Sequence, residues 1–140
     1  MRVVLDTDIL VAGLRSPDGA SRELLRAALA GRVSPLVSTP LLLEYETVLT
    51  RPERLAETGL TVLEVIAFID ALLGRARPVT FDIRWRPTGA DADDEHVLET
   101  AINGQAEAIV TFNLRHLAGP AARFGIHATR PGPFLRELKP

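Results

Sequence analysis

Short apolar runs alternate along the chain with longer segments in which apolar residues recur at helical spacing. Short runs that are rich in β-branched side chains are typical of buried strands. They occupy residues 2–5, 35–38, 78–81 and 108–111, and a weaker run covers residues 125–128. The remaining periodic segments predict helices at residues 9–15, 21–30, 40–51, 61–74, 91–102 and 133–138. Strands separated by helices predict an α/β fold with a mostly parallel sheet of four to five strands, covered on both faces.

Two helix starts carry recognisable capping signals. Thr39 followed by Pro40 is typical of an N-cap residue and a proline at the first helical position. Thr61 and Glu64 have the spacing of a capping box, in which each side chain bonds to the backbone of the other residue. Residues 82–90 show neither period and are expected to form a loop.

The chain length of 140 residues is sufficient for one domain with a buried core, and we expect a single domain over residues 1–140. The absence of cysteine excludes disulfides and thiolate metal sites, and it favours a cytoplasmic protein. No apolar run approaches the ~20 residues that span a bilayer. The first residues do not have the form of a secretion signal. We therefore expect a cytoplasmic protein that is not bound to membranes.

The acidic residues are concentrated, and this changes the meaning of the net charge of −2. Seven of the 18 acidic residues belong to the candidate cluster described next, which leaves 11 against 16 basic residues elsewhere. All basic residues except Lys139 are arginines. Arginine binds phosphate bidentately, so the bias is compatible with a nucleic-acid ligand. A GC-rich genome explains the same bias more simply.

Acidic side chains follow or face the ends of several predicted strands. Asp6 ends the first strand, Glu44 lies in the helix after the second, Asp94 lies in the first turn of the helix before the fourth, and Asn113 follows the fourth. Because the carboxyl ends of parallel strands meet at one edge, we expect these side chains to converge there. Oxygen ligands of this kind suit Mg²⁺ or Mn²⁺, and a bound cation would relieve the repulsion between like charges.

Simpler interpretations exist for several of these residues. Asp91, Asp93 and Glu95 could stabilise a helix N-terminus through the helix dipole. Asp8 could cap the first helix, and Glu44 could lie on an exposed helix face. His96, His116 and His127 lack zinc-ligand spacing and are interpreted as surface or structural residues, and Tyr45 and Trp85 as packing residues.

Four segments carry a resemblance to a known family. They are residues 3–8 (Val-Val-Leu-Asp-Thr-Asp), residues 38–52 (Ser-Thr-Pro-Leu-Leu-Leu-Glu-Tyr-Glu-Thr-Val-Leu-Thr-Arg-Pro), residues 91–99 (Asp-Ala-Asp-Asp-Glu-His-Val-Leu-Glu) and residues 108–117 (Ala-Ile-Val-Thr-Phe-Asn-Leu-Arg-His-Leu). In this order and at these separations the chain resembles PIN domains over nearly its full length. The resemblance is to the VapC-like branch, described as toxin components of type II toxin–antitoxin systems.

The resemblance implies a three-layer α/β/α domain and a Mg²⁺- or Mn²⁺-dependent ribonuclease. It implies Asp6, Glu44 and Asp94 as catalytic metal ligands, with Asn113 as a fourth ligand. Asp8 and Asp93 would orient water around the metal, and Arg115 would contact the RNA backbone. The partners that it implies are an RNA substrate, a cognate antitoxin and a second copy of the chain.

Two departures from the family pattern leave an alternative open. Asp8 stands where the family usually has Asn, and the neutral Asn113 stands where many members have an acid. The Asp that often follows shortly after is His116 here. A catalytically weak PIN domain that binds RNA or protein is therefore the alternative. A phosphatase-like enzyme would need a lysine partner for its nucleophile, and the terminal Lys139 makes this reading unfavourable.

Overall fold

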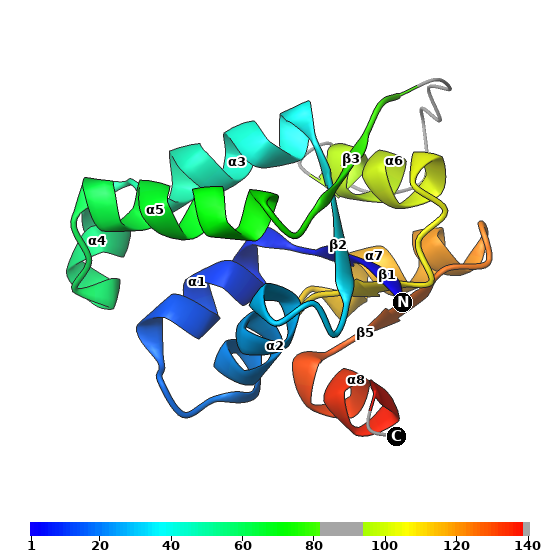
Figure 1. Cartoon of the computed structure of the whole chain (residues 1–140). Helices are drawn as coiled ribbons and strands as arrows, with labels where there is room; N and C mark the ends of the chain where they lie inside the picture. Colours follow the sequence, from blue (N-terminus) through cyan, green and yellow to red (C-terminus); the bar gives the residue numbers. More distant parts are fainter. Residues whose placement is uncertain (82–93, 139–140) are drawn as a thin grey trace.

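The computed structural model describes residues 1–81 and 94–138 of the chain. Within these residues the strands are β1 (Arg2–Leu5), β2 (Ser34–Ser38), β3 (Arg77–Val79), β4 (Ala108–Val110) and β5 (His127–Thr129). The helices are α1 (Thr7–Arg15), α2 (Ala20–Leu29), α3 (Thr39–Leu49), α4 (Pro52–Thr58), α5 (Val62–Leu73), α6 (Glu95–Asn103), α7 (Leu114–Ala122) and α8 (Pro131–Leu138). The strands form one parallel sheet in the order β3-β2-β1-β4-β5, which confirms the expected α/β class (Figure 1).

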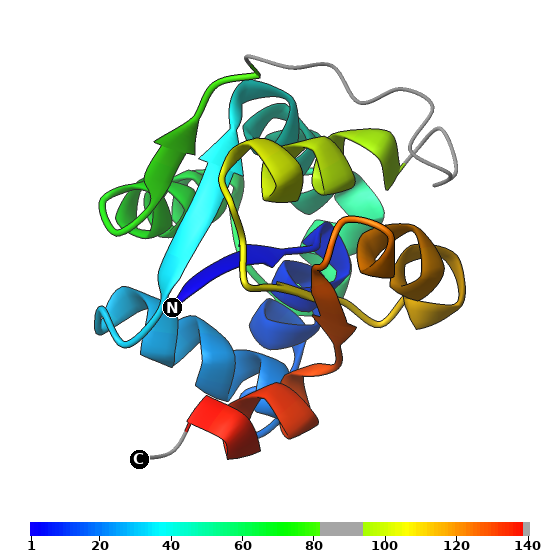
Figure 2. The ribbon, with the colours of Figure 1, turned by 90° about the vertical axis from the view of Figure 1, so that its right-hand side faces the viewer.

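Helices cover both faces of the sheet. Figure 2 shows α6 and α7 on one face, and α2, α5 and α8 on the other. This arrangement is the expected three-layer α/β/α architecture, and it follows from right-handed crossovers between parallel strands. Among the described helices, none combines the length and the apolar character that crossing a membrane requires.

The two central strands form the middle of the core. The side chains of Val3 and Val4 in β1 and of Ile109 and Val110 in β4 have no exposed surface. Strands buried on both faces are continuous apolar runs rather than alternating ones, and the sequence shows such runs at both positions. The same burial explains why these strands could be located from the sequence.

The register of β1 against β4 determines which residues meet at the carboxyl edge. Leu5 pairs with Val110, and the N–H of Asp6 donates a hydrogen bond of 3.0 Å to the carbonyl oxygen of Val110. Asp6, which follows β1, therefore lies beside Thr111, which follows β4. This edge carries the candidate site.

Helix boundaries differ from the prediction in a few places. The N-cap of α3 is Ser38, one residue earlier than predicted, because its hydroxyl accepts a hydrogen bond of 3.3 Å from the N–H of Leu41. The capping box of Thr61 and Glu64 is confirmed. Helices α4 and α7 were not predicted. The loop expected at residues 82–90 and the packing role expected for Trp85 lie outside the described residues.

Candidate functional site

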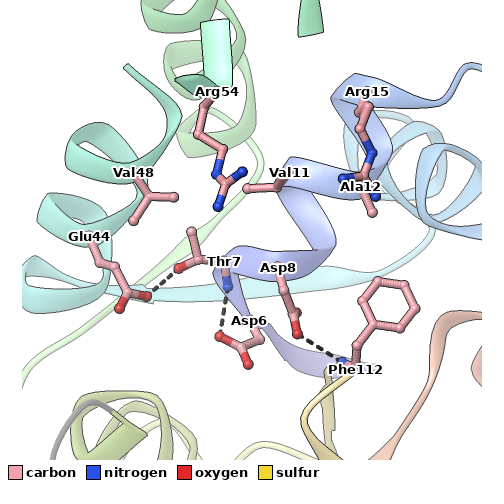
Figure 3. A pocket seen from close by; sticks show the side chains of 10 residues that line it. All are labelled: Asp6, Thr7, Asp8, Val11, Ala12, Arg15, Glu44, Val48, Arg54 and Phe112. Carbon is pink, nitrogen blue, oxygen red and sulfur yellow. Dashed lines mark hydrogen bonds between the residues drawn. The ribbon is translucent and has the colours of Figure 1, made fainter. Parts of the chain in front are cut away.

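A cavity of about 320 Å³ opens at the carboxyl edge beside β1 (Figure 3). Three of the acids singled out in the sequence contribute to its wall, namely Asp6, Asp8 and Glu44. Its other lining residues are Thr7, Val11, Ala12, Arg15, Val48, Arg54 and Phe112. The residue that follows β1, residues of α1, α3 and α4, and the segment after β4 thus meet in one place.

Asp6 is held firmly at the N-terminus of α1. One carboxylate oxygen accepts a hydrogen bond of 2.8 Å from the N–H of Thr7, and the other accepts one of 2.7 Å from the hydroxyl of Thr111. Only 8% of the residue is exposed. Burial raises the pKa of Asp6 above its ordinary value, although the hydrogen bonds from Thr111 and Thr7 oppose this effect. The carboxylate is fixed in orientation but is poorly compensated in charge.

Asp8 lies in the first turn of α1 and is not its cap, since the N-cap is Asp6. Its Oδ2 accepts a hydrogen bond of 3.0 Å from the N–H of Phe112, while its buried Oδ1 has no hydrogen-bond partner among the described residues. Burial, followed by the charge of Asp6, raises the pKa of Asp8 to about 7. A second uncompensated carboxyl group therefore faces the cavity.

Helix α3 presents Glu44 to the same cavity. The hydroxyl of Tyr45 donates a hydrogen bond to the carbonyl oxygen of Leu5, which anchors α3 on the end of β1. Tyr45 is buried, as a packing residue should be. Glu44 accepts a hydrogen bond from the hydroxyl of Thr7, and its Oε2 lies 3.2 Å from Nε2 of His96. Burial raises the pKa of Glu44, but the contacts with His96 and Thr7 outweigh it, so the pKa is lowered.

Asp94 and Asn113 contact each other. The side-chain amide of Asn113 donates a hydrogen bond of 3.2 Å to Oδ2 of Asp94. The backbone N–H of Asn113 donates one of 2.9 Å to the hydroxyl of Thr111, which also binds Asp6. Asn113 occupies the N-cap position of α7 without a side-chain capping bond, so capping does not explain its orientation.

His96 marks the point toward which the acids converge. The contact of its Nε2 with the carboxylate of Glu44 raises its pKa, burial opposes this, and the charges of Glu44, Asp6 and Asp94 add to the increase. Helix α6 is fixed in place by Thr100, whose hydroxyl lies 2.7 Å from that of Ser38 at the end of β2. The sequence indicates only a surface or structural role for His96, whereas the structure places it against Glu44. Its position inside the acidic segment was the only signal that it belongs to the candidate site.

The acids are close in space but already have internal partners. Within residues 1–81 and 94–138, no group of three or more His, Asp or Glu side chains is arranged so that it could hold a metal ion. The donor chemistry nevertheless fits a hard cation, because three carboxyl groups line the cavity and one of their oxygens, the buried Oδ1 of Asp8, has no hydrogen-bond partner within those same ranges. To bind a metal, Glu44 would therefore have to give up its contact with His96, and Asp94 its hydrogen bond from Asn113.

Two arginines that the sequence did not single out lie at the rim of this cavity. Arg54 and Arg15 both contact Glu57, with N–O distances of 2.8 and 3.7 Å. Arg115, the arginine that was singled out, is exposed in the first turn of α7 and is not part of the cavity wall.

The remaining candidates are distributed differently. Glu95 is buried in the first turn of α6, and His116 is exposed on α7. Asp91 and Asp93 lie outside the described residues. The predicted orientation of water by Asp93 therefore stays a prediction.

The sequence model of a family described as "PIN domain" matches residues 2–115. A search among curated proteins finds no significant match. The matched span includes Asp6, Glu44, Asp94 and Asn113, and it covers more than half of the chain.

Proposed function

Because the chain belongs to the PIN domain family, whose members are generally nucleases, we propose that it is a metal-dependent ribonuclease that hydrolyses RNA phosphodiester bonds. The observation that carries this proposal is that Asp6 and Glu44, from distant parts of the chain, line one cavity, with His96 in contact with Glu44 and Asp94 bound to Asn113 nearby in the sequence segment after β4. Acids rarely gather in a partly buried site without a compensating cation.

The family generally uses divalent metals, and the residues that would hold one here are Asp6, Glu44 and Asp94, with Asn113 as a neutral fourth ligand. When bound, Mg²⁺ or Mn²⁺ would polarise a phosphoryl oxygen and make a water molecule a stronger nucleophile. Thr7 and Thr111 keep the carboxylate of Asp6 in a fixed orientation. Fixed donors of this kind lower the reorganisation that the reaction requires.

Other side chains would act on the substrate and on water. Arg54 and Arg15 can neutralise phosphate charge at the rim, and Arg115 remains a proposed contact to the RNA backbone. Asp8 would orient water near the metal, as proposed also for Asp93. A phosphate group could replace Glu57 as the partner of both rim arginines.

The test is RNA cleavage in Mg²⁺ or Mn²⁺ by the wild type and by Asp6→Asn and Asp94→Asn. Both variants are expected to lose metal-dependent cleavage while keeping a melting temperature close to that of the wild type. Asp70→Asn is the matched control, since this exposed residue of α5 loses the same charge far from the cavity. Full activity in either site variant would remove that residue from the proposed mechanism.

The alternative, a PIN domain that binds RNA or protein without efficient cleavage, is favoured by a specific observation. Glu44 is paired with His96 and Asp94 with Asn113, so two of the proposed ligands already have partners. A wild type that binds RNA but shows no cleavage in either metal would support this alternative.

The finer biological role is also a proposal, namely a single-domain cytoplasmic toxin that forms a homodimer and is inhibited by a cognate antitoxin. Its support is the motif resemblance together with apolar side chains that would suit a protein interface. Leu43 on α3 and Leu63 on α5 are 57% and 78% exposed. Expression without a partner should arrest growth, and Glu44→Gln should relieve the arrest. Harmless expression of folded wild type would contradict the toxin role.

A further inference from the structure

A second cavity of about 330 Å³ adjoins the acidic one. The two cavities share Ala12, Arg15 and Phe112 in their walls. Among its described lining residues, the only charged side chains are Arg15 and Arg130. The chain therefore places a positively charged hollow directly beside a negatively charged one.

Sheet topology explains why these residues meet. Val110 pairs with Thr129, so the segments that follow β4 and β5 leave the sheet side by side. Phe112 follows the first of these strands and Arg130 follows the second. The N–H of Thr111 donates a hydrogen bond of 2.9 Å to the carbonyl oxygen of Thr129, which extends the pairing beyond the strands.

Phe112 stands between the two cavities with 44% of its surface exposed. The hydrogen bond from its N–H to Asp8 fixes the backbone of Phe112, so the point from which the ring projects is defined (Figure 3). Figure 3 shows the ring beyond Asp8, on the side of Arg15. An exposed aromatic ring next to arginines is the combination that binds an unpaired base and its phosphate.

Both arginines are available to a ligand. The guanidinium of Arg130 is exposed and has no ion pair or hydrogen bond among residues 1–81 and 94–138. Within the described part of the chain Arg15 has only the 3.7 Å contact with Glu57, and its side chain is 53% exposed. Such an exposed ion pair contributes little, so a phosphate can replace it at low cost. The cavity also includes the start of α2, where the N-cap Gly19 provides no side-chain capping bond.

We propose that this second cavity is a nucleotide subsite, in which an unpaired base stacks on Phe112 and the adjoining phosphate is bound by Arg15 and Arg130. The inference rests on the proposed function, because it takes the strand in the acidic cavity to be RNA. The subsite also gives the direction in which the RNA leaves that cavity, which is across Phe112 toward β5. It also explains why a chain with a net charge of −2 can hold a polyanion.

The test is the binding of an end-labelled, single-stranded RNA octamer, followed by fluorescence anisotropy at several salt concentrations. Measurements are made in EDTA, and repeated with Mg²⁺ in the Asp6→Asn background. Phe112→Leu should lower the affinity roughly tenfold, and Phe112→Tyr should restore it. The effect of Phe112→Leu should vanish for the same strand in a duplex, since paired bases cannot stack on the ring.

Arg130→Gln should weaken binding and reduce the slope of log affinity against log salt by about 0.7, as expected for one lost phosphate contact on a single strand. Arg77→Gln, an exposed arginine on the edge strand β3, is the matched control and should leave the slope unchanged. Binding by the wild type with unchanged affinity and slope in all variants would overturn the subsite alone. No RNA binding under either condition would overturn the proposed function, and the subsite with it.

Discussion

The buried carboxyl group of Asp6 and the half-buried one of Asp8 make the metal-free protein sensitive to pH, and Asp8 offers the clearest test. Asp8→Asn removes one charge and preserves the shape of the side chain. The amide oxygen can still accept the hydrogen bond from the N–H of Phe112 that Oδ2 accepts now. The variant therefore separates the charge of Asp8 from its structural contact.

The pKa of Asp8 rises from the ordinary 3.8 to about 7, because burial disfavours the charged form. The folded protein therefore holds the proton more tightly than the unfolded chain does. The free energy of unfolding falls as the pH rises from about 4 to about 7, and the loss is complete above that range. At about 1.4 kcal/mol per pKa unit the upper bound on this loss is about 4 kcal/mol.

Partial exposure of the side chain reduces this figure, and about 2 kcal/mol is the magnitude that we expect. For a chain of this size, 1 kcal/mol changes the melting temperature by about 2–4 °C. Asp8→Asn should therefore melt about 4–8 °C above the wild type at pH 8 in EDTA, and the gain should disappear toward pH 4. Thermal melts at pH 4, 5, 6, 7 and 8 measure this, with Asp70→Asn as the exposed control.

A stability gain that is the same at every pH would show that the charge of Asp8 is not its cause. No gain at pH 8 would show that the carboxyl group is already compensated in the metal-free protein. Either result would refute the reasoning from burial.

Two further predictions concern the contacts of the site and the packing beneath it. Asn113→Asp should bind Mn²⁺ roughly tenfold more tightly than the wild type, as measured by calorimetry. The variant should melt at a lower temperature in EDTA, because a second carboxylate would replace the amide that now donates to Asp94. Unchanged Mn²⁺ affinity would show that residue 113 does not face the metal. Gly13→Ala should cost about 1–3 kcal/mol of unfolding free energy, since an added Cβ would lie 2.4 Å from Cδ1 of Leu25. Gly19→Ala should be tolerated, because its added Cβ would lie 3.6 Å from Oγ of Ser16. Urea denaturation of both glycine variants decides this, and equal stability would contradict the packing argument.

The sequence predicted the central strands β1 and β4 and the acidic edge for the same physical reason. Strands buried on both faces are uninterrupted apolar runs, and the residue after such a run lies at the edge of the sheet. Asp6 could therefore be placed from its position alone. Glu44 and Asp94 required the further assumption that their helices return to that edge.

The contacts within the site could not be predicted in this way. The pairing of Glu44 with His96 depends on how α6 packs against β2, which no periodicity encodes. The bond from Thr111 to Asp6 depends on the exact register of β1 and β4. The arginines of the rim reach the cavity through long side chains, so their positions along the helices gave no signal.

Two helices were missed for different reasons. Helix α4 has no buried residues among its seven, so it has no apolar stripe that could be recognised. Helix α7 contains Gly119 and Pro120, which are signals for an interruption, yet it buries Leu117 and Ala121 against the core. Tertiary packing outweighed local propensity in this segment.

The hydrogen bond between Asp6 and Thr111 joins residues that are 105 positions apart. During synthesis, β1 leaves the ribosome long before β4, the strand that pairs with it, so β1 is at first without this neighbour. Closing such a long loop is slow compared with forming local helices. A nascent chain therefore cannot assemble the acidic site until residue 111 has emerged, so the timing of translation determines when the site can form.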